Sequence, residues 1–130
     1  MRVIKFRGFH ADEHGVTVIK LDGKEIRGLW IVGDLEQCDG LCWIEQQAVI
    51  PETVGQYVCD DEKGKEVFEG DIVSGYFDHK TITGHIFYGS NAKFFIYRKG
   101  LFGIELNNAS VWINVIGNIF ENSDLLEVEE

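Results

Sequence analysis

The stretch that decides the fold is GKEVFEGDIV, residues 64–73. Gly64 and Gly70 bracket a short extended piece, and glycine adopts the positive φ angles of tight turns without steric cost. Asp71 follows directly, where its short side chain can bond nearby backbone amides. The next two residues are β-branched, which favours a strand. The stretch therefore predicts a turn that leads into a barrel-type strand of a mostly-β protein.

Short runs of β-branched and aromatic residues recur on both sides of this stretch, separated by turn residues. After it, we expect strands at residues 72–77, 81–88, 93–97, 103–106 and 115–120. Before it, we expect strands at residues 3–9, 16–21, 26–32 and 54–59. Asp22 and Gly23 predict a hairpin turn, because both positions of a type I′ turn need positive φ.

The region between these strands is less regular. Residues 33–40 are polar and predict a connection, whereas residues 41–50 fit a strand without clear alternation. Pro51 cannot donate a ladder hydrogen bond, so we expect the run to end there. The 130 residues fit a single domain, and the soft boundary near Pro51 allows two lobes, a β meander at 1–52 and a barrel-like lobe at 53–130.

The predicted fold class is mainly β: an antiparallel meander plus a small SH3-like barrel or sandwich. The 15 glycines and the lack of long Ala/Leu/Glu/Lys runs agree with this class. Asn122 or Ser123 is expected to cap a short C-terminal helical turn, with Asp124 well placed near its N-terminus.

The formal net charge of −10 argues against a nonspecific nucleic-acid binder and against an anionic membrane surface as partner. It leaves open an acidic inhibitor that mimics DNA by presenting carboxylates in place of phosphates. No apolar stretch approaches the length of a membrane-spanning helix, and the early alternation in MRVIKFRGF does not resemble a signal peptide. The three cysteines are an odd number, so a reduced, cytoplasmic state is the expectation.

The histidines and cysteines form no convincing catalytic or metal-binding set. In HADEH, His10 and His14 lie four apart, but Ala11 stands where a zincin carries glutamate, and the segment is predicted to be a hairpin loop. Cys38 and Cys42 bracket a glycine turn, yet only Cys59 and scattered histidines could complete a zinc site. His79 and His85 flank a strand after Asp78, but no nucleophile elbow accompanies them. We therefore expect no enzyme activity, no cofactor and no metal.

Aromatic residues are the remaining candidates, namely Trp30, Trp43, Trp112 and the pair Phe94 and Phe95. Neighbours in a strand point to opposite faces, so one phenylalanine of the pair faces away from the core and is expected to meet another subunit. We therefore expect a homo-oligomer.

A nucleic-acid-related module is an alternative. Lys93, Arg98 and Lys99 form a local basic strip beside Phe94 and Tyr97, a combination that suits single strands. The net charge opposes this interpretation.

Four segments in order give the chain its resemblance to YopX family proteins: RVIKFRGF at the N-terminus, VGQYV in the centre, GKEVFEGDIV, and VIGNIFENSDLLE at residues 115–127. Residues 24–52 and 80–110 match only in general character. One departure is that Val58 and Cys59 follow Gln56 and Tyr57, where the family usually has threonine and glycine and then a turn about one residue longer.

The resemblance implies a phage- or prophage-borne protein of a bacterial host, in a family without an assigned biochemical function. It implies a non-enzymatic accessory role through contacts with host or phage proteins. Asp71, Asn118 and Asn122 are explicable as turn and capping residues. We therefore interpret the shared motifs as segments that determine the fold.

Overall fold

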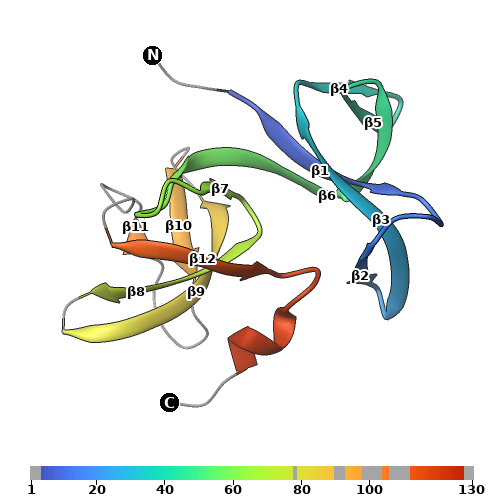
Figure 1. Ribbon diagram of the computed structural model, residues 1–130. Helices are drawn as coiled ribbons and strands as arrows, with labels where there is room; N and C mark the ends of the chain where they lie inside the picture. Colours follow the sequence, from blue (N-terminus) through green and yellow to red (C-terminus); the bar gives the residue numbers. More distant parts are fainter. Residues whose placement is uncertain (1–3, 78, 90–92, 98–103, 106–111, 128–130) are drawn as a thin grey trace. The chain divides into compact units, whose positions relative to one another are not determined.

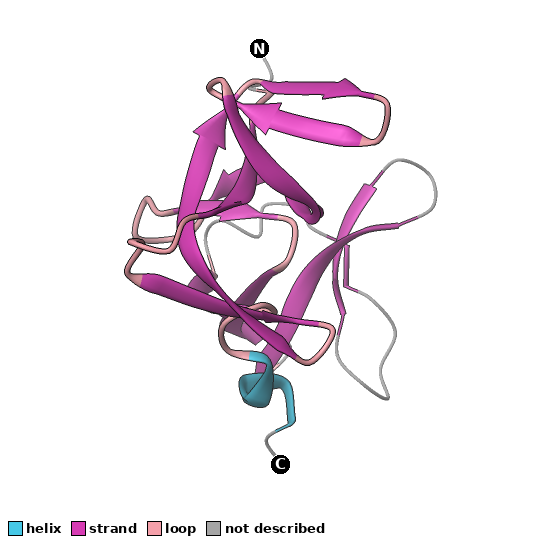
Figure 2. Cartoon of the chain, turned by 90° about the vertical axis from the view of Figure 1, so that its right-hand side faces the viewer, coloured by secondary structure: helices cyan, strands magenta, loops and turns pink. Residues whose placement is uncertain are grey.

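The computed structural model describes residues 4–77, 79–89, 93–97, 104–105 and 112–127. Most of them lie in antiparallel strands, and the one helical element among them is the 3-10 turn η3, Ser123–Glu127 (Figure 2). The mainly β prediction is confirmed. The chain forms two compact units, Met1–Tyr57 and Val58–Glu130, so the division lies beyond Pro51, inside a strand.

The first unit is an antiparallel sheet with strand order β2-β3-β1-β6-β5-β4 (Figure 1). Asp22 and Gly23 have φ angles of 53° and 78°, so the predicted hairpin turn joins β2 to β3. The strands are β1 Phe6–Ala11, β2 Thr17–Leu21, β3 Lys24–Gly33, β4 Leu35–Cys38, β5 Leu41–Ile44 and β6 Gln47–Asp60.

Two predictions for this unit are wrong. The polar segment 33–40 contains a strand, β4, which pairs with β5 through Leu35 and Ile44. The run around Pro51 does not end there, because β6 continues to Asp60. The pairing of β1 with β6 shifts register between Arg7 and Phe9, and proline is tolerated at such irregularities because the missing N–H breaks no regular ladder.

The core of the first unit is a cluster of four buried side chains, Ile31, Cys42, Ile44 and Val49. Nearby, Phe9 is fully buried and its backbone N–H donates to the Thr53 hydroxyl at 2.9 Å. That hydroxyl in turn donates to the Ile50 carbonyl at 2.6 Å. Thr53 is 1% exposed, so this buried polar side chain is satisfied by the two strands it links.

The second unit contains a five-stranded sheet with order β11-β10-β9-β8-β12. Its strands are β8 Asp71–Phe77, β9 Lys80–Gly89, β10 Lys93–Tyr97, β11 Ile104–Glu105 and β12 Ile113–Asn118. One face carries a core cluster, Val67, Val73, Ile86, Ile96 and Ile113. In the described part of the chain, both strand orders are open and no pairing closes a barrel.

GKEVFEGDIV forms the turn and the strand entry that its sequence predicts, but the strand it enters, β8, belongs to an open sheet in the described part of the chain and not to a closed barrel. Gly64 has a φ of 85° in the turn after β6, and a short strand follows, β7 Glu66–Phe68, which pairs with β6. Gly70, with a φ of 96°, turns the chain into β8. Asp71 is 2% exposed, and its Oδ2 accepts the Phe68 N–H at 2.8 Å.

The C-terminal turn differs in detail from the prediction. Asn118 Oδ1 accepts the N–H groups of Phe120 and Glu121, both at 2.9 Å. Asn122 Oδ1 accepts the Asn118 N–H at 3.1 Å, so its side chain bonds back toward β12. η3 ends at Glu127, and residues 128–130 lie outside the described part of the chain. No helix among the described residues has the length and apolar character needed to cross a membrane.

Candidate functional site

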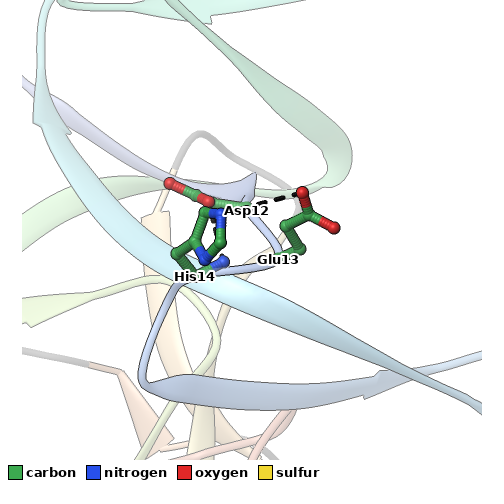
Figure 3. A network of polar contacts seen from close by, with 3 residues as sticks. All are labelled: Asp12, Glu13 and His14. Carbon is green, nitrogen blue, oxygen red and sulfur yellow. Dashed lines mark hydrogen bonds and ion pairs between the residues drawn. The ribbon is translucent and has the colours of Figure 1, made fainter.

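The two histidines of HADEH serve different parts of the structure. His10 lies in β1, where its Nδ1 is 2.7 Å from the Ala48 carbonyl oxygen. His14 lies in the following turn, where its N–H donates to Asp12 Oδ1 at 2.9 Å and its Nε2 is 3.7 Å from Glu13 Oε2 (Figure 3). Both side chains of the Glu13–His14 pair are more than four-fifths exposed. The segment is thus a hydrogen-bonded surface turn.

The three cysteines are free and lie in different environments. Cys42 is buried in the core of the first unit, and its Sγ accepts from Gln37 Nε2 at 3.6 Å. Cys38 is exposed and pairs with Leu41, whereas Cys42 pairs with Gln37, so the two thiols point to opposite faces of the β4–β5 hairpin. CDGLC therefore does not form a two-cysteine hook.

Cys59 belongs to the second unit, where it packs against the core cluster. Burial, with smaller effects of the Asp60 and Asp61 charges, raises the pKa of its thiol to about 11. This thiol therefore stays protonated at neutral pH and is a poor nucleophile. Within the described ranges, no three His, Cys, Asp or Glu side chains are grouped as metal ligands.

His79 and His85 are also separated by the fold. His79 is exposed in the turn before β9, with a φ of 65°, and Asp78 lies outside the described residues. His85 lies in β9 and is half-buried; burial lowers the pKa of its imidazole. Its Nδ1 is covered and has no hydrogen-bond partner. The ring is therefore neutral near pH 7 and packs as part of an aromatic surface.

That surface is the outer aromatic cluster, His85, Phe87, Phe95 and Tyr97. Phe87 and Phe95 are directly paired across β9 and β10, and their rings stack at 5.5 Å. Tyr97 contacts His85 at 5.6 Å and Phe87 at 5.9 Å between ring centroids. Tyr97 remains 41% exposed.

The outer aromatic cluster lies on the face of the sheet opposite the core. Ile86 and Ile96 are paired with each other and point into the core cluster, so their strand neighbours point to the second face. Strand pairing places nine described side chains of β8, β9 and β10 on this second face: Ile72, Ser74, Tyr76, Thr81, Thr83, His85, Phe87, Phe95 and Tyr97. None of the nine carries a formal charge near pH 7, given the neutral His85.

The prediction that one phenylalanine of the pair in β10 faces away from the core holds for Phe95. The side chain of Phe94 lies outside the described residues, as do Arg98, Lys99 and the side chain of Lys93. The basic strip weighed from the sequence is therefore outside the described part of the chain.

The three tryptophans are separated as well. Trp30 contacts Phe9 edge-on at 5.1 Å and lies under the Arg7 guanidinium. Trp43 is half-buried in β5. Trp112 packs against the core cluster of the second unit and also lines a groove there.

The groove is the feature of the second unit that sequence reasoning missed. It is an open depression of about 570 Å³ beside β8 and β12. Its walls combine a carboxylate, an ammonium group, an amide, two hydroxyl side chains, two aromatic rings and an isoleucine: Glu62, Lys63, Asn114, Ser74, Thr81, Tyr76, Trp112 and Ile116, with Gly75 between them. The sequence signal was weak, because these residues come from four separate segments whose register had to be known.

Polar residues in the family-like motifs, and Asp61 just before GKEVFEGDIV, bond to the backbone and stabilise the fold. Asp61 is 6% exposed and accepts three backbone N–H groups, those of Lys63 and Lys65 at 2.9 Å and of Val115 at 3.0 Å. Burial acts to raise the pKa of this carboxyl, but the three hydrogen bonds outweigh it and hold the pKa below its usual range. Together with the bonds of Asp71 and Asn118, this arrangement fixes turns and presents no reactive group.

Comparison with known proteins agrees with the motifs. The model of the YopX protein family matches residues 5–127, which is nearly the whole chain. A search of curated proteins finds no match. The chain belongs to the YopX family.

Proposed function

We propose that this protein is a non-enzymatic accessory protein of phage or prophage origin that acts through protein contacts in the cytoplasm of a bacterial host. The family motifs support an architectural role for the polar residues they contain, since Asp71 and Asn118 bond to backbone groups. The resemblance to phage-borne YopX proteins supports the origin.

The observation that carries the proposal is the uncharged second face of the five-stranded sheet. The protein has a net charge of −10, so two copies repel each other wherever their acidic surfaces meet. The second face, with the outer aromatic cluster, lacks such charges among its described side chains of β8, β9 and β10. Aromatic residues are enriched and charged residues depleted at the centres of protein interfaces. A second copy of the chain is the occupant that fits the part of this face on β9 and β10, where the outer aromatic cluster lies.

Self-association is tested by sedimentation velocity over a concentration series. A lysine at Tyr97 puts a charge into the proposed interface, and Tyr97→Lys should weaken association at least about tenfold. The matched control is Tyr88→Lys, because Tyr88 is a 51% exposed tyrosine of the same sheet on the opposite face, and it should leave association unchanged.

Two outcomes would contradict self-association through this face. The first is a wild-type protein that stays monomeric up to about 100 μM. The second is an equal loss of association in both lysine variants, which would reflect added charge or lost stability in place of an interface. Circular dichroism of both variants establishes that they fold.

A further inference from the structure

The groove beside β8 and β12 has the dimensions and chemistry of a ligand site. Its volume of about 570 Å³ lies within the range of small-molecule and side-chain pockets. Ser74 lies in β8 and Thr81 lies in the neighbouring strand β9. The two strands are paired through Ser74 with Thr83 and through Tyr76 with Thr81. The groove is therefore built on the sheet itself, which holds its walls in place.

Asn114 supplies a hydrogen-bond acceptor that the protein leaves unused. Its Nδ2 donates to Glu62 Oε1 at 2.8 Å, which fixes the amide beside the carboxylate. Its Oδ1 is buried and has no hydrogen-bond partner. A buried acceptor without a donor is destabilising, so an N–H group of a ligand that reaches this oxygen gains a hydrogen bond. Access of a ligand to this buried oxygen requires the Asn114 amide to turn and to give up its hydrogen bond to Glu62.

Acceptors and aromatic rings dominate the rest of the lining. Glu62 is exposed and has a second carboxylate oxygen, and the hydroxyls of Ser74 and Thr81 accept as well as donate. Tyr76 is 64% exposed, so its ring is open to a ligand, and the Trp112 ring lies at the same groove. Aromatic rings attract cations, and guanidinium groups stack on them.

These features together match one ligand group. A guanidinium carries five N–H donors in a planar fork and no acceptor, which suits the Glu62 carboxylate and the hydroxyl oxygens of the groove. The net charge of −10 attracts cations to the protein, whereas Lys63 at the groove opposes them locally. We propose that the groove binds the guanidinium of an arginine side chain presented by a basic segment of a partner protein. Lys63 then limits the affinity.

The test uses the full-length protein and the peptide acetyl-Gly-Arg-Gly-amide. Trp112 is one of three tryptophans, so indole N–H signals in a ¹H–¹⁵N NMR titration report separately on the groove and on Trp30 and Trp43. Only the Trp112 signal should shift and saturate. The same peptide with citrulline in place of arginine keeps the shape without the charge, and it should bind at least about fivefold more weakly.

Variants of the adjacent residues Glu62 and Lys63 distinguish the binding of a cation from the binding of a neutral ligand or an anion. Glu62→Gln should raise the dissociation constant about three- to fivefold, and Lys63→Met should lower it about twofold. Glu52→Gln is the matched control, because it removes one exposed carboxylate from the first unit, and it should change the constant by less than about 1.5-fold. Tyr76→Ala should weaken binding without loss of structure, since that ring is mostly exposed.

Three outcomes would overturn the proposal. No shift of Trp112 with the arginine peptide rules it out directly. Equal binding of the citrulline and arginine peptides indicates a site for a neutral ligand. A lower dissociation constant for Glu62→Gln and a higher one for Lys63→Met, together with binding of inorganic phosphate, indicate an anion site. The groove shares Ser74, Tyr76 and Thr81 with the second face, so the titration is run at a concentration where sedimentation velocity shows a monomer. A chain that stays monomeric and shows the Trp112 shift contradicts only self-association, and an oligomer whose monomer shows no shift contradicts only the groove.

Discussion

The backbone N–H of Val115 donates a 3.0 Å hydrogen bond to Asp61 Oδ2 and so joins the turn after β6 to strand β12. The same carboxylate accepts the N–H groups of Lys63 and Lys65 through Oδ1. The neighbouring Glu62 N–H donates to the Ile113 carbonyl at 3.1 Å. This turn therefore ties the residues just before EVFEGDIV to the last strand of the sheet.

Replacement of this carboxylate should destabilise the second unit. Asp61→Asn keeps the size of the side chain but turns an acceptor oxygen into an N–H₂ donor, which leaves one backbone N–H facing another donor. We expect a loss of about 1–3 kcal/mol in the free energy of unfolding, measured by urea denaturation. The matched control, Asp124→Asn, changes an exposed aspartate of η3 and should stay within about 0.5 kcal/mol. Equal losses in the two variants would contradict a special role for Asp61.

The depressed pKa of Asp61 also predicts how stability depends on acid. The unfolded chain takes up a proton near the ordinary value of 3.8, whereas the folded chain does so at lower pH. Between these values the unfolded state binds more protons, so the contribution of Asp61 is complete above about pH 5 and is lost as the pH falls through the folded pKa. The difference in unfolding free energy between wild type and Asp61→Asn should therefore shrink below about pH 5. A constant difference down to acid unfolding would contradict this prediction.

GKEVFEGDIV could be predicted in detail because its determinants are local. The positive φ angles of Gly64 and Gly70 follow from residue type, and Asp71 bonds a backbone N–H only three residues away. Strand β4 could not be predicted in the same way. It is an edge strand with three exposed residues out of four, so its sequence lacks the alternation that marks a half-buried strand.

The candidate sites depend on register, which the sequence leaves open. The stacking of Phe87 on Phe95 follows from the pairing of β9 with β10, and a shift of one residue would send Phe95 to the other face. The groove likewise needs Asn114 from β12 beside Glu62, far earlier in the chain. The sequence predicted that one residue of the pair Phe94 and Phe95 faces outward, but it could not tell which one or which residues lie beside it.

Thr53 offers a test of the first unit that is separate from these sites. Thr53→Val keeps the shape of the side chain but removes the hydroxyl that links the Phe9 N–H to the Ile50 carbonyl. The buried Phe9 N–H and the part-buried Ile50 carbonyl then lose this partner, so we expect a loss of about 2 kcal/mol in unfolding free energy. Pro51→Ala in the same strand should cost no more than about 1 kcal/mol, because no ladder hydrogen bond is removed. A smaller effect for Thr53→Val than for Pro51→Ala would contradict this account of β6.

His85 predicts a second pH dependence, near neutrality. Burial lowers the pKa of its imidazole from the ordinary 6.5, so the unfolded chain binds a proton at a pH where the folded ring is still neutral. Stability should therefore be complete above about pH 7.5 and should decline as the pH falls through 6.5 toward the folded pKa. His85→Phe keeps an aromatic ring beside Phe87 and Tyr97 and removes the unpaired Nδ1. The unfolding free energy of this variant should therefore vary less between pH 5 and pH 7.5 than that of wild type, and the two slopes should differ by roughly the uptake of one proton.

The measurement is the slope of unfolding free energy against pH, with the imidazole signals followed by NMR in the folded protein. His14→Asn is the control, because His14 is exposed in the HADEH turn, and its slope should match that of wild type. An His85→Phe protein with the wild-type slope, or a His85 signal that titrates at or above pH 6.5, would show that the ring is solvated in the outer aromatic cluster. The predicted result instead means that protonation at His85 opposes the packing of this cluster, since the charged ring must leave its neighbours to regain water.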